Sequence, residues 1–319
     1  MTTEIQGETA AVRTAAVRTA AVRTAAVRTG VIGLGAMGLP MAKTLADKGF
    51  AVIGFDLDAA RRAEAAAAGI ELADSALGLF RAAGVVVFSL PAAQHVLSVI
   101  EASGLLDSDL SRRVVIDTST SEPGVSRKIA ADLAARGHGF LDAPVSGGPA
   151  GAATGNLSFM IGGDEADFAA AQDQLTALGA KVLHVGPSGA GNVTKLVNNM
   201  LVACHMLTTA EGLRLAEAAG VSAGDALRVV NAASGRSMLS EVHFPNWVLS
   251  GNFNSGFATG LMRKDLRLAL EMAAQTGAEL PIAELARVLW SPEVSGVADA
   301  DDFTRLGDPA HQPHSVKEV

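Results

Sequence analysis

The glycine pattern between residues 33 and 38 constrains the fold of this chain more than any other feature. It is a Gly-x-Gly-x-x-Gly motif that follows an apolar run over residues 27–32 and precedes a helical pattern over residues 39–48. The first glycine permits a tight turn, the second lets the backbone approach a pyrophosphate, and the third lets the helix pack closely. The motif therefore predicts a dinucleotide-binding turn made of Gly33, Leu34, Gly35, Ala36, Met37 and Gly38.

Asp56 indicates which dinucleotide this turn would bind. It ends the next apolar run, at the spacing expected in a dinucleotide-binding βαβ unit. A carboxylate there accepts hydrogen bonds from ribose hydroxyls and repels a 2′-phosphate, which favours NAD. Arg61 and Arg62 could reach a phosphate, although on a helix they are better explained as solvated cations. The sequence therefore predicts NAD without excluding NADP.

The remaining pattern predicts the fold class. Short apolar runs alternate with helical stretches, which is typical of a parallel sheet covered on both faces by helices. Strands are expected over residues 27–32, 51–56, 85–90, 114–117, 140–143, 157–161 and 181–185. After Gly191 the strands stop, and residues 192–290 are almost wholly helical in pattern. We expect a Rossmann-type, doubly wound, mainly parallel α/β domain followed by an all-α domain.

The two ends of the chain have unusual compositions. Residues 10–29 hold four copies of Ala-Ala-Val-Arg-Thr, and each copy advances a helix by about 500°, so no continuous apolar stripe forms. The segment after residue 291 is rich in Asp, Pro and His. We expect a disordered tail over residues 1–25, a Rossmann domain over 26–190, a helical substrate and dimerisation domain over 191–291, and a loosely ordered tail over 292–319.

Composition excludes several classes of function. The 319-residue chain has a formal net charge of -8, which offers no basic field for a nucleic-acid backbone. Its single cysteine, Cys204, excludes an internal disulfide framework and fits a reducing compartment. No apolar run is long enough to span a bilayer, and the histidines lack metal-ligand spacing. We expect a cytoplasmic protein with neither a membrane span nor a metal site.

Residues 189–199 predict a proton-transfer site. The run reads Gly-Ala-Gly-Asn-Val-Thr-Lys-Leu-Val-Asn-Asn, so Lys195 and Asn199 share one face of the expected helix. The chain contains no tyrosine, so proton transfer at a carbonyl would fall to Lys, His or a carboxylate. An ordinary lysine is charged at neutral pH, so Lys195 would need burial or a neighbouring cation to act as a base.

Three other strand ends carry candidate ligand contacts. In open parallel sheets, ligands bind beyond the carboxyl ends of the strands. Candidate walls for the nicotinamide ribose are Leu90, Pro91 and Thr120, although turn and capping chemistry explains these residues equally well. Small residues that leave backbone N–H groups uncovered can bind a carboxylate. Such a substrate clamp is predicted at Ser146, Gly147 and Gly148.

Four ordered motifs resemble the β-hydroxyacid dehydrogenase family, which includes 3-hydroxyisobutyrate dehydrogenase and tartronate semialdehyde reductase. They lie at residues 30–42, 142–148, 189–199 and 264–265, and the resemblance covers about residues 27–290. It implies a Rossmann domain, a helical domain, NAD(P), a small 3-hydroxy acid or its semialdehyde, and a dimer or tetramer. It also implies that Lys195 is the catalytic lysine, Asn199 its partner, and Lys264 a cofactor or substrate contact.

Two residues have less specific signals. His95 lies four residues after Pro91, where the family often has an asparagine near the cofactor, so it is either a cofactor contact or a surface residue of a helix. Arg236 could bind a second anionic group of the substrate or pair with a carboxylate across a subunit interface. Substrate identity should reside here and near residues 243–247, where the chain departs from the better-characterised branches.

Two alternative functions remain at this point. Imine reductases share the nucleotide fold, and a non-catalytic nucleotide-binding scaffold would keep the fold without the chemistry. Both would usually lack the lysine, so the intact motif around Lys195 argues against them.

Overall fold

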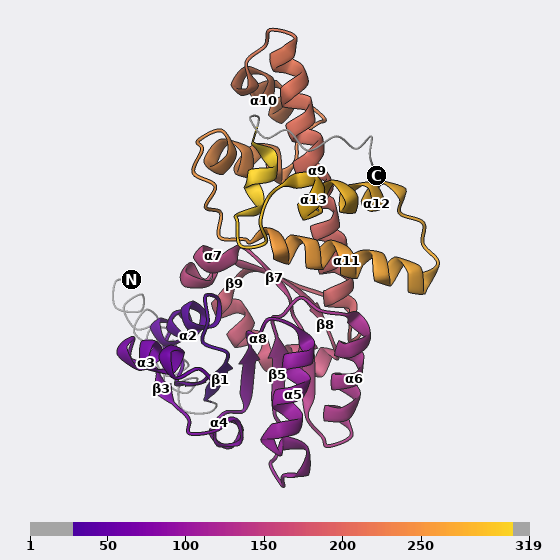
Figure 1. Cartoon of the computed structure of the whole chain (residues 1–319). Coiled ribbons are helices and arrows are strands. Elements are labelled where there is room, and N and C mark those ends of the chain that lie inside the picture. Colours follow the sequence, from indigo (N-terminus) through magenta and orange to yellow (C-terminus); the bar gives the residue numbers. More distant parts are fainter. Residues whose placement is uncertain (1–27, 309–319) are drawn as a thin grey trace, which may run out of the picture. The chain divides into compact units, whose positions relative to one another are not determined.

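The computed structural model describes residues 28–308, which form two compact units (Figure 1). The first unit comprises the described residues up to Ser119 together with Gly124–Ser188. The second comprises Thr120–Pro123 and the described residues from Gly189 onward. The tail predicted over residues 1–25 lies outside the described residues. Among those described, no helix is both long and apolar enough to cross a membrane.

The first unit contains one sheet with helices between its strands. The strands are β1 (Thr29–Ile32), β2 (Val52–Phe55), β3 (Glu71–Leu72), β4 (Val85–Phe88), β5 (Val114–Asp117), β6 (Gly139–Asp142), β7 (Val145–Ser146), β8 (Leu157–Gly162) and β9 (Gly179–Gly186). The helices are α2 (Gly38–Asp47), α3 (Ala59–Ala67), α4 (Ala76–Ala82), α5 (Ala93–Ser103), α6 (Pro123–Ala134), α7 (Gly148–Thr154), α8 (Glu165–Leu178) and the short 3₁₀ helix η1 (Leu105–Asp107).

The strand order confirms the predicted fold class. The order is β3-β2-β1-β4-β5-β6, with all neighbours parallel, which is the doubly wound arrangement of dinucleotide-binding domains. Beyond β6 the sheet continues with β8, which is antiparallel to β6 and β7 and parallel to β9. The strands expected from residue 51 onward are present to within two residues. The strands β3 and β7 were not predicted, because two-residue strands have no measurable periodicity in the sequence.

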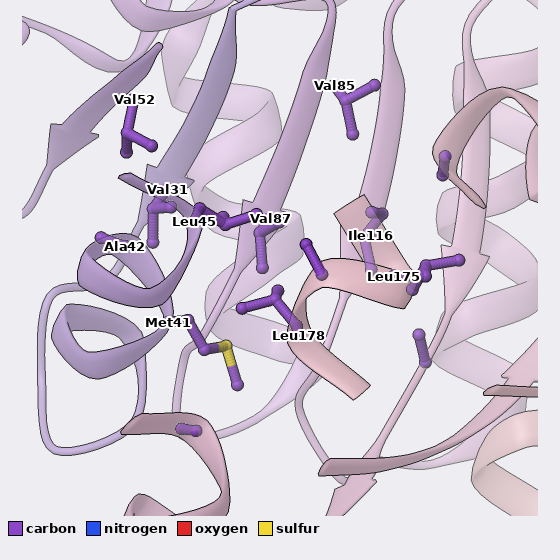
Figure 2. Close-up of a cluster of buried hydrophobic side chains, with 14 of the residues drawn as sticks. Val31, Met41, Ala42, Leu45, Val52, Val85, Val87, Ile116, Leu175 and Leu178 are labelled. Atoms are coloured by element: carbon purple, nitrogen blue, oxygen red, sulfur yellow. The ribbon is translucent and has the colours of Figure 1, made fainter. Parts of the chain in front are cut away.

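Alternate residues of the central strands supply two hydrophobic cores, one on each face of the sheet. On β4, Val85 and Val87 pack on the face covered by α2 and α8, as Figure 2 shows. Their neighbours Val86 and Phe88 pack on the opposite face, against α4, α5 and α6. Fully burying such a side chain stabilises a fold by roughly 1.5–3 kcal/mol. Burial on both faces explains why these strands are continuous apolar runs.

The second unit is helical, as predicted. Its elements are α9 (Ala190–Ala218), α10 (Ala223–Ala232), the π-helix η2 (Leu239–Val248), α11 (Thr259–Thr276), α12 (Pro281–Trp290), α13 (Pro292–Ser295) and the 3₁₀ helix η3 (Phe303–Gly307). The longest, α9, extends over about 43 Å at 1.5 Å per residue. It buries Ala203, Met206, Ala210 and Leu213, whose spacing of three and four residues forms a stripe along one face.

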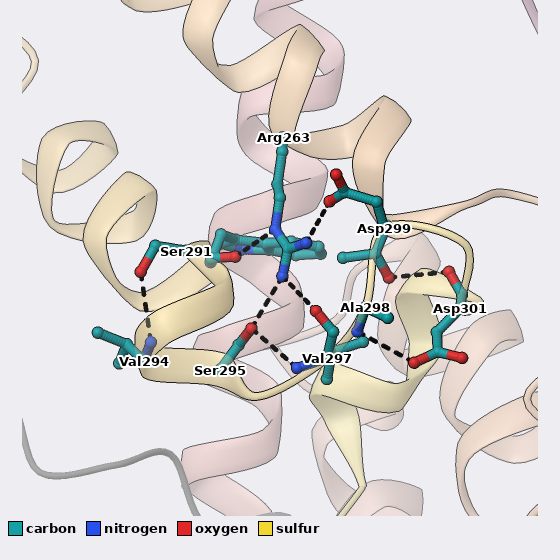
Figure 3. A network of polar contacts seen from close by, with 10 residues as sticks. Arg263, Ser291, Val294, Ser295, Val297, Ala298, Asp299 and Asp301 are labelled. Atoms are coloured by element: carbon teal, nitrogen blue, oxygen red, sulfur yellow. Dashed lines mark hydrogen bonds and ion pairs between the residues drawn. The ribbon is translucent and has the colours of Figure 1, made fainter.

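The described part of the C-terminal segment, residues 292–308, differs from the loose tail that we expected. Phe303 and Leu306 are buried in the core of the second unit. The segment is also anchored by Arg263 of α11, which donates hydrogen bonds to Trp290 O and Val297 O and forms an ion pair with Asp299 (Figure 3). The expectation followed the polar composition and overlooked the few large apolar residues that fix the segment.

His138 should make the stability of the first unit depend on pH. Its buried Nδ1 accepts a hydrogen bond from Arg113 N at 3.1 Å, and burial, aided by the charges of Arg113 and Arg112, lowers the pKa of His138. Because the pKa of His138 in the folded state lies below the unfolded value of about 6.5, the contribution of the neutral ring to the free energy of unfolding is complete above pH 6.5. It is lost as the pH falls through 6.5 toward the folded-state pKa.

Chemical denaturation between pH 8 and pH 5 tests this expectation. The free energy of unfolding should fall toward pH 5 less steeply in His138→Asn than in the parent protein. His95→Asn, which changes an exposed histidine, should keep the parental pH dependence. Equal slopes for the parent and His138→Asn would contradict the assignment.

Candidate functional site

Gly33 and Gly38 shape the turn between β1 and α2. Gly33 has φ = 89°, a conformation that favours glycine, and a Cβ there would overlap the carbonyl oxygen of Ser89. Gly38 is the first residue of α2, and a Cβ there would overlap the carbonyl oxygen of Gly33. Both glycines are therefore required by the packing of the turn itself.

Gly35 is different, because internal packing does not require it. A Cβ at Gly35 would meet no protein atom within 4 Å. The backbone at this position is thus open to a ligand, as a bound pyrophosphate requires. No acidic side chain occupies the first turn of α2, so the positive end of its dipole is not neutralised there. These features fit the phosphates of a dinucleotide.

Asp56 follows β2 and links its end to the glycine turn. Its Oδ2 accepts a hydrogen bond from Leu34 N at 2.7 Å, and its Oδ1 accepts one from Asp58 N at 2.9 Å. A carboxylate oxygen can accept two hydrogen bonds, so each oxygen retains one acceptor position for a ribose hydroxyl.

The two arginines near Asp56 are held by other groups. Arg62 Nη1 donates to the carbonyl oxygens of Asp56 and Leu57, at 2.7 and 2.9 Å. Arg61 forms an exposed ion pair with Glu64 at 3.3 Å. In this conformation the cations support the backbone and the surface of α3.

The candidate nicotinamide contacts after β4 divide into two groups. Leu90 lies against the glycine turn, since a Cβ at Gly33 would be 2.8 Å from its Cδ2. Pro91 and His95 are exposed, and His95 is the third residue of α5. The structure therefore brings Leu90 to the turn but shows no such contact for His95.

The predicted carboxylate clamp starts on a strand. Ser146 is the last residue of β7 and pairs with Ser158 of β8, where we expected a turn. The turn begins at Gly147 and Gly148, whose φ angles of 124° and 59° favour glycine. Helix α7 begins at Gly148, and the first N–H groups of a helix have no acceptor within it. These donors suit an anion.

Lys195 and Asn199 lie in the first three turns of α9, and both are buried. Asn199 Nδ2 donates to Asp265 Oδ2 at 2.6 Å, which links α9 to α11. Asp265 is only 2% exposed, and its charge is compensated by this bond and by Lys264 Nζ, 3.3 Å from Oδ1. An amine, an amide and a carboxylate thus form a buried polar cluster.

The short segment Thr120–Pro123 is attached to this cluster. Lys264 Nζ donates to the Thr120 carbonyl oxygen at 2.8 Å. Ser121 N donates to Oδ1 of the buried Asn192, in the first turn of α9, at 2.9 Å. The predicted contact residues Thr120 and Lys264 are therefore in direct contact with each other.

The environment of Lys195 changes its proton affinity. The pKa of Lys195 is lowered from its ordinary value to about 8, chiefly because burial disfavours the charged amine. The carboxylate of Asp265 opposes this effect and raises the pKa, whereas the ammonium of Lys264 lowers it. A pKa near 8 makes both protonation states accessible close to neutral pH, which suits an acid/base catalyst.

No role was assigned to Asp265 from the sequence. Asp265 follows Lys264 on α11, and its position among the buried Met262, Leu266 and Ala269 was the available signal. Arg236 lies in an exposed turn and pairs with Glu241 at 3.4 Å. Within residues 28–308, no group of three His, Cys, Asp or Glu side chains could hold a metal.

Comparison with known proteins defines the family. Residues 28–186 match the family model described as the NAD binding domain of 6-phosphogluconate dehydrogenase. Residues 189–308 match a second family model, described as the NAD-binding part of NADP-dependent 3-hydroxyisobutyrate dehydrogenase. The 2-(hydroxymethyl)glutarate dehydrogenase of Eubacterium barkeri is 37% identical over 252 residues, which cover 79% of this chain and 84% of the relative. The chain belongs to the β-hydroxyacid dehydrogenase family.

Other members of the family agree in sequence and in structure. The NAD-dependent L-serine dehydrogenase of Pseudomonas aeruginosa is 40% identical over 258 residues, covering 79% of this chain and 87% of the relative. The structure of Mycobacterium tuberculosis 3-hydroxyisobutyrate dehydrogenase with L-serine has a TM-score of 0.82 at 33% identity. The match covers 88% of this chain and 98% of the other. This β-hydroxyacid dehydrogenase is thus an oxidoreductase that uses NAD(P).

Two glycine substitutions should separate cofactor binding from folding. Gly35→Ala fills space that no protein atom occupies, so unfolding should be unchanged while the Kd for NADH rises roughly tenfold. Gly38→Ala overlaps the Gly33 carbonyl, so it should lower the free energy of unfolding by about 1–3 kcal/mol. Denaturation and NADH fluorescence titrations measure both. Normal NADH affinity in Gly35→Ala would show that no phosphate approaches there.

Proposed function

We propose that this β-hydroxyacid dehydrogenase interconverts a small 3-hydroxy acid and its semialdehyde, with Lys195 as the general acid/base. The observation that carries the proposal is the buried amine of Lys195, whose pKa is lowered to about 8. Proton exchange with an alcohol requires a group that is neutral in one direction of the reaction and charged in the other. Lys195 meets this requirement near neutral pH.

The proposed substrate class follows from the relatives. The names of the relatives refer to 2-(hydroxymethyl)glutarate, L-serine and 3-hydroxyisobutyrate. All three carry a hydroxymethyl group on the carbon that bears a carboxylate. We infer the same unit for this enzyme, with the carboxylate bound by the Ser146 hydroxyl and by the N–H groups of Gly147 and Gly148.

The roles of the buried cluster follow from its hydrogen bonds. A bound nicotinamide dinucleotide supplies the hydride acceptor for oxidation and the donor for reduction. In oxidation, neutral Lys195 Nζ accepts the hydroxyl proton as the C–H hydride departs and the carbonyl forms; in reduction, its ammonium returns the proton. One N–H of the Asn199 amide is bonded to Asp265, and the other is available to hold the reacting oxygen.

The residues proposed to hold the cofactor are those of the glycine turn and Asp56. The engagement of Arg61 and Arg62 with other groups supports a preference for NAD over NADP. We also retain Leu90, Pro91, His95, Thr120 and Lys264 as proposed cofactor contacts, and Arg236 as a proposed substrate contact.

A homodimer or homotetramer is proposed from the surface of the second unit. Large apolar side chains are exposed on four of its helices: Val197, Leu201 and Leu215 on α9, Val229 on α10, Leu261 on α11, and Ile282 and Leu285 on α12. Exposed apolar surface of this kind is typical of faces that are covered in an assembly.

Removal of the Lys195 amine should stop turnover without loss of cofactor. The parent enzyme should reduce NAD with at least one of 3-hydroxyisobutyrate, L-serine and 2-(hydroxymethyl)glutarate, and NADP more slowly. Lys195→Ala should lower kcat by about 10²–10⁴-fold while the Kd for NADH stays unchanged. Lys128→Ala, which removes an exposed lysine paired with Asp132, is the matched control. Near-normal turnover by Lys195→Ala would refute its role.

The neighbours of Lys195 should shift the pH profile in opposite directions. In the parent enzyme, kcat/KM for oxidation should rise with pH through an apparent pKa of about 8, because only the neutral amine accepts a proton. Asp265→Asn removes the charge that raises this pKa, so its profile should move to lower pH. Lys264→Met removes the opposing charge and should move it to higher pH. Shifts of the same sign would contradict this electrostatic account.

A further inference from the structure

The orientation of the Asn199 amide is fixed by chemistry on one side. An ionised carboxylate accepts hydrogen bonds and donates none, so the group that faces Asp265 Oδ2 at 2.6 Å must be the NH₂ of Asn199. The Asn199 Oδ1 atom therefore points away from Asp265. Because Asn199 is buried, this oxygen needs a donor, and leaving it without one would cost the desolvation free energy of the carbonyl.

Asn198 supplies that donor. Its Nδ2 lies 3.1 Å from Asn199 Oδ1 and donates to it. The side chains of Asn198, Asn199 and Asp265 thus form a directed chain, in which each NH₂ donates to the next oxygen. Hydrogen bonds in such a chain polarise one another, so a bond to the Asn199 carbonyl makes its remaining N–H a better donor.

We propose that Asn198 is a positioning residue for the hydrogen transfer, an inference that rests on the proposed function. It holds the acceptor end of the Asn199 amide, so that Asn199 offers a substrate only an N–H donor. A donor is the group that the reacting hydroxyl or carbonyl oxygen requires, and it strengthens as negative charge develops on that oxygen. Asn198 acts through Asn199 and does not itself touch the substrate.

The inference predicts different results for two substitutions at one position. Asn198→Ala removes the donor, so kcat for 3-hydroxyisobutyrate, or for L-serine if that acid is turned over faster, should fall roughly tenfold. Asn198→Asp is nearly the same size but presents only acceptors, which repel Asn199 Oδ1, so kcat should fall further. The added negative charge, three residues from Lys195 on α9, should also raise the apparent pKa of kcat/KM. Asn198→Ala should leave that pKa unchanged.

A matched control lies on the same helix. The Thr194 hydroxyl donates to Ala190 O at 2.8 Å, within α9, and takes no part in the Asn198–Asn199–Asp265 chain. Thr194→Val should therefore leave kcat and the pH profile unchanged. In all three variants the Kd for NADH should stay close to the parent value and thermal unfolding should remain a single cooperative transition, although Asn198→Ala and Asn198→Asp should unfold at a somewhat lower temperature because Asn199 Oδ1 loses its donor. An intact fold with normal NADH affinity separates positioning from a general loss of structure.

Two results would overturn the role of Asn198. One is a kcat within twofold of the parent for both Asn198→Ala and Asn198→Asp. The other is a loss of kcat in the Asn198 variants that is accompanied by an equal loss of NADH affinity, or that is equally large in Thr194→Val, while the pH profile of Asn198→Asp does not shift. Lys195→Ala, assayed in parallel, distinguishes the two proposals. If it is active, the proposed function fails; if it is inactive while the Asn198 variants turn over normally, only this inference fails.

Discussion

The buried carboxylate of Asp265 is the group on which the polar cluster of the second unit depends. Taking a carboxylate out of water costs several kcal/mol unless it is paired and hydrogen-bonded. Here Asn199 Nδ2 at 2.6 Å and Lys264 Nζ at 3.3 Å provide that compensation. The same charge limits how far burial can lower the pKa of Lys195. Without the Asp265 charge the pKa of Lys195 would be lower, so a smaller share of the lysine would carry, near neutral pH, the proton that reduction requires.

The glycine turn of the first unit shows how one short motif serves both folding and binding. Gly33 and Gly38 are required because side chains there would overlap the backbone of Ser89, just after β4, and of the turn itself. Gly35 satisfies no such internal requirement, since the space beside it is open. Only the structure distinguishes these reasons for glycine. The difference matters because open space beside the backbone at Gly35 is what the close approach of a pyrophosphate requires.

Sequence patterns predicted the parts of this molecule that depend on local order. Strands of four or more residues and the long helical stretch after Gly191 could be read from periodicity, and the fold followed from them. The two-residue strands β3 and β7 exist only because longer neighbours pair with them. The bond between Asn199 and Asp265 joins residues 66 positions apart, so neither motif alone could predict it. Packing of Phe303 likewise outweighed the polar composition around it.

Three consecutive residues of α11 connect the ordered C-terminal segment to this chemistry. Successive helical side chains are separated by about 100°, so neighbours point in different directions. Arg263 binds the segment around Trp290 and Val297, Lys264 binds the Thr120 carbonyl, and Asp265 binds Asn199. The rotation of α11 about its axis therefore sets all three contacts at once. The Arg263 network fixes that rotation, so the C-terminal segment, remote in sequence from Lys195, helps to hold in place the two charges that adjust its pKa, which burial chiefly lowers.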